Sequence, residues 1–415
     1  MTTEPRPSAT ILIAARNAAA TITHAVRSAV AQGPYPLLLI DDHSGDDTVA
    51  VAQAVAGPHL RVVRPPDHGP LGATRQAGLL AVETPYAAWL DADDEFLPGR
   101  LPRLLKALAD RDGDIAVDAA DLADDGHTEP GDLLGIPTFL TRDPWLARQF
   151  ERNYLPAPGA IVFRTDALRA LGYDTTLHGA EDMDVILRAA MAGARFVIVP
   201  EPGYRIHALP GSQSRQIENQ RLMYGRALRK HEYESVEALL ARAGYGARIA
   251  MWALVSMAAF REDVDEALAW LDRIEALGGD AAAIEEPDGP SPFPEAWRIA
   301  FWRGTLLLET GQFLRARTCL ARAEALRPSP EGANNLGVAE LLAGRADVAG
   351  TWFNIATARA PHYRDALLNL HRPGDVPRIT THPFRVQPNR TDYQVGPSVG
   401  PPPACHPRRR ARRAA

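Results

Sequence analysis

The chain has 415 residues, of which 46% are hydrophobic and 23% charged, and its formal net charge at pH 7 is −6. This length is enough for two or three domains with cores of their own, and the composition is typical of a soluble globular protein. The charge balance gives no reason to expect nucleic acid as a partner, and two cysteines, Cys319 and Cys405, exclude a disulfide framework and a cysteine-based zinc site.

The N-terminal residues, MTTEPRPSAT, carry no basic region followed by an apolar one, so they do not resemble a secretory signal. No apolar run in the sequence reaches the length that a membrane-spanning helix needs. We therefore expect a cytoplasmic protein that contacts the inner face of the membrane peripherally at most.

The first half of the chain alternates short apolar runs with segments of helical periodicity. Such an alternation predicts an α/β fold with a mostly parallel sheet covered on both faces. The expected strands are residues 10–15, 37–40, 60–63 and 87–90, with helices at 18–32, 48–56 and 72–81. Further strands are expected at 159–163 and 195–199, on either side of a helix that begins near Glu181.

Polar residues follow three of these strands directly. Asn17 follows the first strand, Asp41 and Asp42 the second, and the stretch WLDADDEFLP (89–98) the fourth. Ligands of doubly wound sheets bind beyond the carboxyl ends of the strands, so these clusters are expected to share one crevice. Turn formation and helix capping explain each cluster equally well when it is taken alone, with Asp46 or Asp47 expected to cap the second helix.

A binding role for these carboxylates requires a cation. A nucleoside diphosphate is strongly negative, and carboxylates alone would repel it. Mg²⁺ or Mn²⁺ prefers oxygen ligands of this kind and, as a Lewis acid, stabilises the charge that develops on a departing diphosphate.

The same segments resemble the donor half of a family 2 glycosyltransferase, an enzyme class with the GT-A fold. The resemblance lies in residues 10–32, in PLLLIDDHSGDDT (36–48) and in GATRQAGLLAVETPYAAWLDADDEFLPGRL (72–101). These segments supply the family's Asn after the first strand, its paired Asp after the second, its Arg-centred helix and its Asp-x-Asp-Asp.

The resemblance implies a role for each matching residue on the donor side. Asp42 would bind the nucleotide base with Ala14 and Asn17 nearby, Arg75 would help to hold the nucleotide, and Asp91 would face the ribose or the sugar. The first strand ends in AARN instead of the commoner Pro-x-Tyr-Asn, which leaves the identity of the base open.

The metal, Mn²⁺ or Mg²⁺, would be bound by Asp93, with Asp94 as an alternative ligand or a helix cap. His207 lies where some GT-A enzymes supply a further metal or diphosphate ligand, although a histidine after a strand is as readily structural. The Gln-x-x-Arg-Trp motif of processive synthases is absent, which favours the transfer of a single sugar.

The acceptor half of the resemblance covers residues 159–193, including the pair Glu181-Asp182. In the family the Asp of this pair is the base that deprotonates the acceptor hydroxyl, which implies Asp182. Glu181, Asp182 and Asp184 also suit the N-terminus of a helix on electrostatic grounds, and the two explanations are compatible.

From Gln216 the chain becomes almost continuously helical and contains two similar segments. Each of seven positions recurs after 33 residues, a spacing that resembles the tetratricopeptide repeat, although an irregular bundle is the alternative. The first copy has Gly304, Gly311, Phe313, Ala316, Leu320, Ala323 and Pro328, and the second Gly337, Gly344, Ala346, Ala349, Phe353, Ala356 and Pro361.

The predicted organisation has four parts. They are a GT-A domain (1–215), a helical linker region with a degenerate repeat around Ala267 and Leu271 (216–295), tetratricopeptide-like repeats (296–370) and a Pro- and Arg-rich tail (371–415). The tail's composition cannot bury a core, so it is expected to be disordered.

We therefore predict an inverting, metal-dependent glycosyltransferase that moves a sugar from a nucleotide-sugar donor to a hydroxyl of a glycan, lipid-linked or protein acceptor. Its expected setting is the synthesis of bacterial surface polysaccharide or glycoconjugates, with a protein partner bound through the repeats. The alternatives are a nucleotidyltransferase and a non-catalytic, nucleotide-binding scaffold that acts through its helical repeats.

Overall fold

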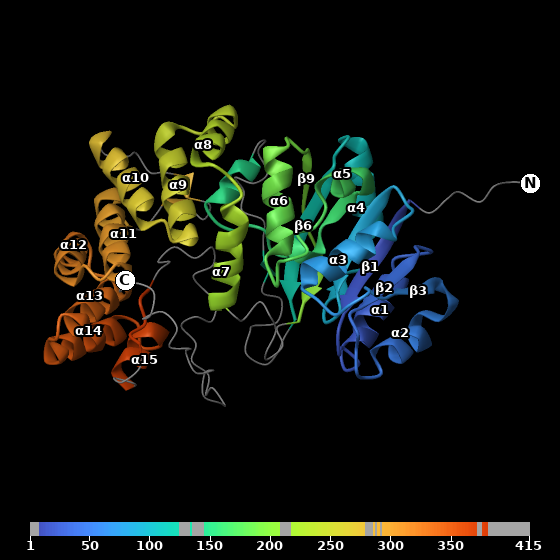
Figure 1. Ribbon diagram of the computed structural model, residues 1–415, viewed down its shortest axis with the longest axis horizontal. Helices are drawn as coiled ribbons and strands as arrows, with labels where there is room; N and C mark the ends of the chain where they lie inside the picture. Colours follow the sequence, from blue (N-terminus) through green and yellow to red (C-terminus); the bar gives the residue numbers. More distant parts are fainter. Residues whose placement is uncertain are drawn as a thin grey trace, which may run out of the picture. The chain divides into compact units, whose positions relative to one another are not determined.

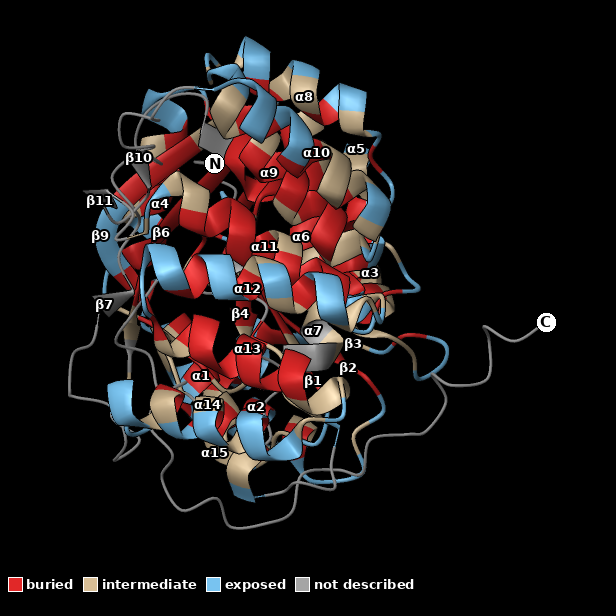
Figure 2. Ribbon diagram, turned by 90° about the vertical axis from the view of Figure 1, so that its left-hand side faces the viewer, coloured by how far each residue is buried: buried red, intermediate tan, exposed pale blue. Residues whose placement is uncertain are grey.

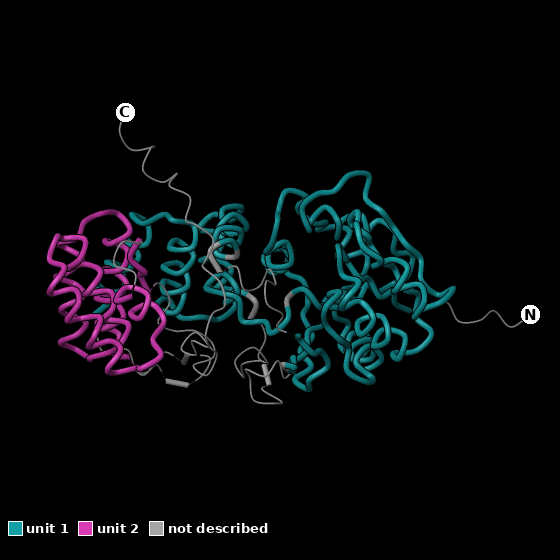
Figure 3. Tube along the Cα trace, turned by 90° about the horizontal axis from the view of Figure 1, so that it is seen from below, with its two compact units in different colours: residues 1–291 teal, residues 292–415 magenta. Residues whose placement is uncertain are grey.

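The computed structural model describes residues 8–123, 133–134, 145–207, 217–278, 285–286, 289–290, 293–371 and 376–380. The chain divides into two compact units, Met1–Ser291 and Pro292–Ala415, which Figure 3 shows in different colours. Apart from His371 and residues 376–380, the predicted disordered tail lies outside the described residues.

The first four strands of unit 1 form a parallel sheet in the order β3-β2-β1-β4. They are β1 (Ala9–Ala15), β2 (Leu37–Asp41), β3 (Leu60–Val63) and β4 (Tyr86–Asp91), joined by α1 (Ile22–Val30), α2 (Thr48–Ala56) and α3 (Leu71–Leu80). Figure 1 shows β1, β2 and β3 beside one another in blue. The α/β class and the parallel pairing of these strands are confirmed.

Helices cover both faces of this sheet, which explains its continuous apolar strands. Ile11 and Ile13 of β1 pack in one core cluster with residues of α1, α2 and α4 (Arg100–Asp110). On the other face α3 lies so close to the sheet that a Cβ on Gly78 would come within 2.8 Å of the Ile40 side chain.

The second half of the sheet mixes strand directions. β8 is antiparallel to β4 and β6, β6 is parallel to β9, and β5 is antiparallel to β9. These strands are β5 (Glu95–Phe96), β6 (Ile115–Leu122), β8 (Val162–Arg164) and β9 (Phe196–Ile206), with the short β7 (Leu133–Leu134) beside β6. The helices of this half are α4, α5 (Thr165–Leu171) and α6 (Glu181–Met191).

Strand β6 is absent from the predicted elements because its sequence, IAVDAADL, is rich in alanine and contains two aspartates. Asp118 can lie inside the protein because Arg100 of α4 pairs with it, through Nε–Oδ2 and Nη2–Oδ1 distances of 2.9 Å. Arg100 is 1% exposed, and its guanidinium carbon lies 4.4 Å from the centre of the Phe96 ring. A Cβ on Gly203 of β9 would lie 2.0 Å from Asp118 Oδ2, so the pair leaves no room for a side chain there.

In the described part of unit 1, four helices follow the sheet. They are α7 (Ile217–Leu228), α8 (Tyr233–Arg242), α9 (Ala247–Arg261) and α10 (Val264–Ala276). Just after α7, Lys230 Nζ lies 2.6 Å from Asp174 Oδ2 and 2.5 Å from Asp184 Oδ1 of α6, so this helical part is tied to the α/β part by charge. The division that we expect at residue 215 remains a prediction.

Unit 2 consists of helix pairs that explain the repeated sequence positions. The helices are α11 (Glu295–Glu309), α12 (Phe313–Leu326), α13 (Pro330–Leu342), α14 (Ala346–Arg359) and α15 (Arg364–His371). A Cβ on Gly304 would lie 2.6 Å from Leu320 Cγ, and one on Gly337 would lie 2.6 Å from Phe353 Cε1, so both glycines permit close helix crossings. Figure 2 shows α13 largely buried and the outer faces of α12 and α14 exposed.

The composition predicts disorder for residues 376–380, but the structure shows a different arrangement. These residues have no regular secondary structure, yet Thr380 is buried against asparagines of α13. Specific polar contacts therefore hold a segment that cannot form an apolar core of its own. Among the described residues, no helix is long and apolar enough to span a membrane.

The first prediction concerns the Arg100–Asp118 pair. An Asp118→Ala variant should lower the free energy of unfolding by about 3–5 kcal/mol, because it leaves the buried guanidinium of Arg100 without a counter-charge. Urea denaturation followed by circular dichroism measures this change. Asp110→Ala is the control, since it breaks the exposed pair with Lys106 and should cost less than about 1 kcal/mol. Equal losses in the two variants would contradict the importance of the buried pair.

Candidate active site

The carboxyl ends of β1, β2 and β4 lie at one edge of the sheet. Ala14 pairs in register with Ile40 of β2 and with Asp91 of β4, and Ala15 pairs with Asp41. The three predicted polar clusters therefore begin beside one another. Ala14 itself is half-buried at the end of β1.

Asn17 fixes the loop after β1 to the loop after β2. Its side-chain Oδ1 accepts from the Gly45 N–H at 2.8 Å, and its own N–H donates to Ser44 Oγ at 3.0 Å. Its backbone φ of 51° lies in the left-handed region, which Asn tolerates better than most residues. Asp47 occupies the N-cap of α2, but Asp46 is the residue that accepts the Thr48 N–H.

Asp42 has one carboxylate oxygen held by the protein and one without a partner. Oδ2 lies 2.8 Å from His68 Nδ1, while Oδ1 is buried and makes no hydrogen bond within the described residues. Leaving a buried acceptor unsatisfied is costly, so a site of this kind is suited to a ligand N–H.

His68 orients Asp42. Its Nε2 lies 2.7 Å from Nη1 of Arg16, and arginine can only donate. His68 Nε2 therefore accepts, and Nδ1 is the nitrogen that donates to Asp42. No sequence pattern marks His68, which lies in the loop PPDHGP.

Arg75 of α3 joins the donor and acceptor halves. Its Nη2 donates to Asp91 Oδ1 at 2.9 Å, its Nε to Glu181 Oε1 at 2.9 Å, and its Nη1 to the Gly159 carbonyl at 3.0 Å. Arg75 is 3% exposed and stacks 4.8 Å from the Trp89 ring. Burial opposes its charge, but Asp91 and Glu181 raise the pKa of the guanidinium above its usual value.

Asp182 and Asp91 approach each other beside Gly159. A Cβ built on Gly159 would lie 3.1 Å from Asp91 Oδ2, 3.5 Å from Asp182 Oδ2 and 3.0 Å from Arg75 Nη2. A side chain at this position would enter the space between the carboxylates. Gly159, in the short 3-10 helix Pro158–Ala160, is thus a site residue that the sequence analysis does not single out.

The acceptor-side pair lies in the first turn of α6. Burial and the neighbouring charge of Asp182 raise the pKa of Glu181 to about 7, although Arg75 opposes the shift. Burial also raises the pKa of Asp182, against the effect of Arg75 and of the Met183 N–H that its Oδ1 accepts at 2.7 Å. Both groups therefore take up protons more readily than exposed carboxylates do.

The acidic stretch after β4 crowds three carboxylates together. Burial, followed by the charges of Asp91 and Asp93, raises the pKa of Asp94 to about 8. Burial and then Asp91 likewise raise the pKa of Asp93. Helix α4 has Gly99 at its N-cap and no side-chain cap bond, so this stretch does not cap that helix.

Asp94 is bound to the end of β9. Its Oδ1 accepts from the main-chain N–H of His207 at 2.8 Å, and the Tyr204 hydroxyl also bonds to its carboxylate. The His207 ring lies beside other groups of the acidic stretch: its Nε2 is 3.6 Å from Glu95 Oε1, and its charge opposes the rise in the pKa of Asp93. The ring also stacks with that of His24, with 6.5 Å between the ring centres. Within the described part of the chain, no group of three or more His, Cys, Asp or Glu side chains is arranged to hold a metal ion.

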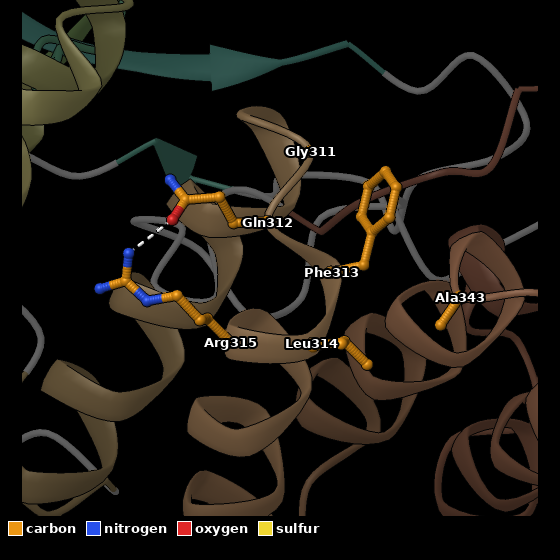
Figure 4. A pocket seen from close by; sticks show the side chains of 6 residues that line it. All are labelled: Gly311, Gln312, Phe313, Leu314, Arg315 and Ala343. Atoms are coloured by element: carbon orange, nitrogen blue, oxygen red, sulfur yellow. Dashed lines mark hydrogen bonds between the residues drawn. The ribbon is translucent and has the colours of Figure 1, made fainter.

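Unit 2 has a shallow pocket of about 490 Å³ at the turn between α11 and α12 (Figure 4). It is lined by residues 311–315 and Ala343, and Gln312 Oε1 accepts from Arg315 Nη1 at 2.5 Å. The pocket contains none of the residues that the sequence predicts for the site.

Comparisons with known proteins agree with this arrangement. The model of the family "Glycosyl transferase family 2" matches residues 10–171, and that of a tetratricopeptide repeat matches residues 301–364. Succinoglycan biosynthesis protein ExoU of Rhizobium meliloti is 34% identical over 251 residues, which are 56% of this chain and 69% of ExoU. ExoO of the same organism is 30% identical over 223 residues, or 50% of this chain and 63% of ExoO. The chain thus spans less than two thirds of ExoO.

Among solved structures, the crystal structure of Staphylococcus aureus TarS (residues 1–349) in complex with UDP-GlcNAc aligns with a TM-score of 0.47 and 14% identity, covering 86% of this chain and 93% of that one. The sequence matches are the informative ones. The chain belongs to glycosyltransferase family 2, and a tetratricopeptide repeat region follows its α/β part. The expected order of an α/β domain followed by a helical-repeat region is confirmed.

The second prediction uses the raised pKa of Asp94. Between its ordinary value of 3.8 and about 8, folded Asp94 keeps a proton that the unfolded chain releases, so its contribution to stability is lost as the pH rises. The Tm of the metal-free protein should therefore fall more steeply from about pH 5 to pH 8 than that of Asp94→Asn. Differential scanning fluorimetry measures both profiles, with the exposed Asp110→Asn as the control. Parallel profiles for the wild type and Asp94→Asn would contradict the raised pKa.

Proposed function

We propose that this protein transfers a sugar from a nucleotide-sugar donor to a hydroxyl group, with inversion at the anomeric carbon. The observation that carries the proposal is the meeting of Asp91 and Asp182 beside Gly159, with Arg75 bound to the first of them. A donor-side carboxylate and a candidate base thus share one small space. Family 2 membership favours sugar transfer over the nucleotidyltransferase alternative.

Asp42 is the residue that we propose for base recognition. Its unpartnered Oδ1 suits an N–H of the nucleotide base, and His68 holds the other oxygen in place. Ala14 and Asn17 would line the same base-binding subsite. Arg75 has all three guanidinium nitrogens bonded within the protein, so we propose that it positions Asp91 and Glu181 instead of contacting the nucleotide.

Asp182 is the proposed base. Its raised pKa makes the ionised carboxylate a stronger proton acceptor than an exposed aspartate. Asp182 would take the proton of the acceptor hydroxyl while that oxygen forms a bond to the anomeric carbon. The bond from that carbon to the diphosphate breaks on the opposite face, and the nucleoside diphosphate leaves with the bonding electrons. Glu181 is held by Arg75 and is proposed as a positioning residue.

We propose that the carboxylates after β4 bind a divalent cation. Burial and, after it, the neighbouring carboxylates raise the pKa values of Asp93 and Asp94, and a bound cation would offset the repulsion between these groups. We propose Asp93 as the principal ligand, with Asp94 and more weakly His207 as candidates beside it. The cation would supply charge neutralisation at the departing diphosphate.

The acceptor is proposed from the relatives. ExoU and ExoO are named as succinoglycan biosynthesis proteins, and succinoglycan is a polysaccharide. We therefore propose that the acceptor hydroxyl belongs to a growing bacterial polysaccharide or glycoconjugate, free or lipid-linked, and that the reaction takes place on the cytoplasmic side of the membrane.

The third prediction separates donor binding from transfer. In a calorimetric screen of UDP-, GDP- and dTDP-sugars with Mn²⁺ or Mg²⁺, at least one donor should bind, and Asp182→Asn should bind it within about two-fold of the wild type. The same variant should lose about 10²- to 10⁴-fold in transfer rate, because the amide cannot accept the proton. Transfer is measured as release of the nucleoside diphosphate in the presence of acceptor.

The control for this experiment is Asp166→Asn, an exposed aspartate in the first turn of α5 that should change neither quantity. If no donor binds with either metal, the proposed function is wrong. If Asp182→Asn keeps the wild-type transfer rate, the function stands but Asp182 is not the base.

A further inference from the structure

The segment Val376–Thr380 lies against the side of unit 2 that carries Thr305 of α11, Asn334 and Asn335 of α13, and Asn369 of α15. The three helices α11, α13 and α15 are alternate helices of unit 2. Both Asn334 and Asn335 are fully buried, and Thr380 is 7% exposed. The contacts are therefore internal ones and not those of a loop resting on the surface.

Two asparagines bind the main chain of this segment in the same way. Asn369 Oδ1 accepts from the Arg378 N–H at 2.7 Å, and its Nδ2 donates to the Arg378 carbonyl at 3.0 Å. Asn335 repeats this arrangement on Thr380, with both distances at 2.8 Å. A carboxamide offers the same donor and acceptor as a peptide group, so each asparagine takes the place of a neighbouring strand.

The spacing of these contacts indicates an extended ligand. The asparagines bond to the main chains of Arg378 and Thr380, which are two positions apart. Alternate residues of an extended chain face the same way. Recognition of this kind does not depend on side chains. It resembles the addition of a peptide strand to the edge of a sheet, with side-chain amides in place of the edge.

One side chain of the segment is recognised specifically. The Thr380 hydroxyl donates to Asp365 Oδ2 at 2.8 Å and accepts from Asn334 Nδ2 at 3.2 Å, and the Tyr363 hydroxyl also contacts it. These groups fit a hydroxyl and would leave a purely apolar side chain with unsatisfied polar neighbours. The contacts therefore suit Thr or Ser at this position.

Asn334 and Asn335 are not positions that recur in the repeat sequence, although they also bond to Thr305, to Asn369 and to each other. The positions 33 residues before Asn334 and Asn335 hold Phe301 and Trp302, and those 33 residues after hold Leu367 and Leu368. Apolar residues thus fill the equivalent places in the neighbouring helices. Buried amides require hydrogen-bonding partners, and here the segment supplies much of what they need.

We propose that this side of the repeat unit is a peptide-binding site for an extended segment with a Thr or Ser, and that Val376–Thr380 occupies it as a ligand from the same chain. Only residues 372–375 separate this ligand from the end of α15. A tether this short gives an effective concentration in the millimolar range or above, so the site is closed to peptides from other chains while its own segment is bound. The proposal does not rest on sugar transfer.

The fourth prediction tests this site in the full chain by fluorescence anisotropy. The probe is a labelled synthetic peptide with the sequence of residues 374–382. Thr380→Pro in the protein removes the N–H that Asn335 accepts and should release the resident segment. This variant should bind the probe at least about ten-fold more tightly than the wild type does, since the wild-type site is already filled. Val376→Pro, at an exposed position of the same segment, should behave as the wild type.

Specificity is tested with a second probe in which valine replaces the threonine equivalent to Thr380. It should bind the Thr380→Pro protein about ten-fold more weakly than the first probe, because the hydroxyl contacts are lost. Equal affinity of the wild type and Thr380→Pro for the first probe would overturn the proposal, as would the absence of binding to Thr380→Pro.

A second measurement keeps the proposal testable if Thr380→Pro does not fold. Thr380→Val removes only the hydroxyl and should bind the first probe more tightly than the wild type, by a smaller factor. Hydrogen exchange of the wild type adds an independent readout: the amides of Arg378 and Thr380 should be protected, and exchange at the rate of a free peptide would contradict the structure of the site.

Discussion

The candidate active site depends on one buried positively charged side chain, the guanidinium of Arg75. Arg75 is surrounded by the carboxylates of Asp91, Glu181 and Asp182, and it bonds directly to the first two. Without it, burial and mutual repulsion would drive these groups toward their protonated forms, and a protonated Asp182 could not act as a base. The planar guanidinium also fixes the relative positions of three elements. It donates to Asp91 at the end of β4, to Glu181 at the start of α6 and to the Gly159 carbonyl. A lysine could supply the charge but not this geometry.

A second buried arginine in unit 1 also joins two elements by pairing with a carboxylate. Arg100 pairs with Asp118 and joins α4 to β6, as Arg75 joins α3 to β4 and α6. In each case a glycine gives the carboxylate its space, Gly203 beside Asp118 and Gly159 beside Asp91. The Arg75 contacts connect the parallel half of the sheet to the mixed half, and the Arg100–Asp118 pair stabilises the mixed half itself. Donor and acceptor residues therefore belong to rigid elements, which suits a transfer that requires precise placement of two reactants.

Much of this site was predictable from local sequence, and the remainder was not for identifiable reasons. Parallel strands with polar residues at their carboxyl ends predict that Asn17, Asp42 and Asp91 share an edge, and the structure brings them there. The bond between Arg75 and Glu181 spans 106 positions in sequence, and no local pattern reports it. Strand β6 escapes prediction because Asp118 interrupts its apolar character. The binding of Thr380 could not be predicted either, because the Pro- and Arg-rich composition of its segment indicates disorder. Its partners are single side-chain amides on helices that are distant in sequence.

The central claim is that Arg75 couples the donor-side and acceptor-side carboxylates, and a double-mutant cycle tests it most directly. Asp91→Asn, Glu181→Gln and the double variant are compared with the wild type in their free energies of unfolding, measured by urea denaturation without metal. Because both carboxylates act through one guanidinium, the two changes should be non-additive, with an interaction energy between about 0.5 and 3 kcal/mol. Additivity within about 0.3 kcal/mol would show that the two sides are independent and would contradict the claim.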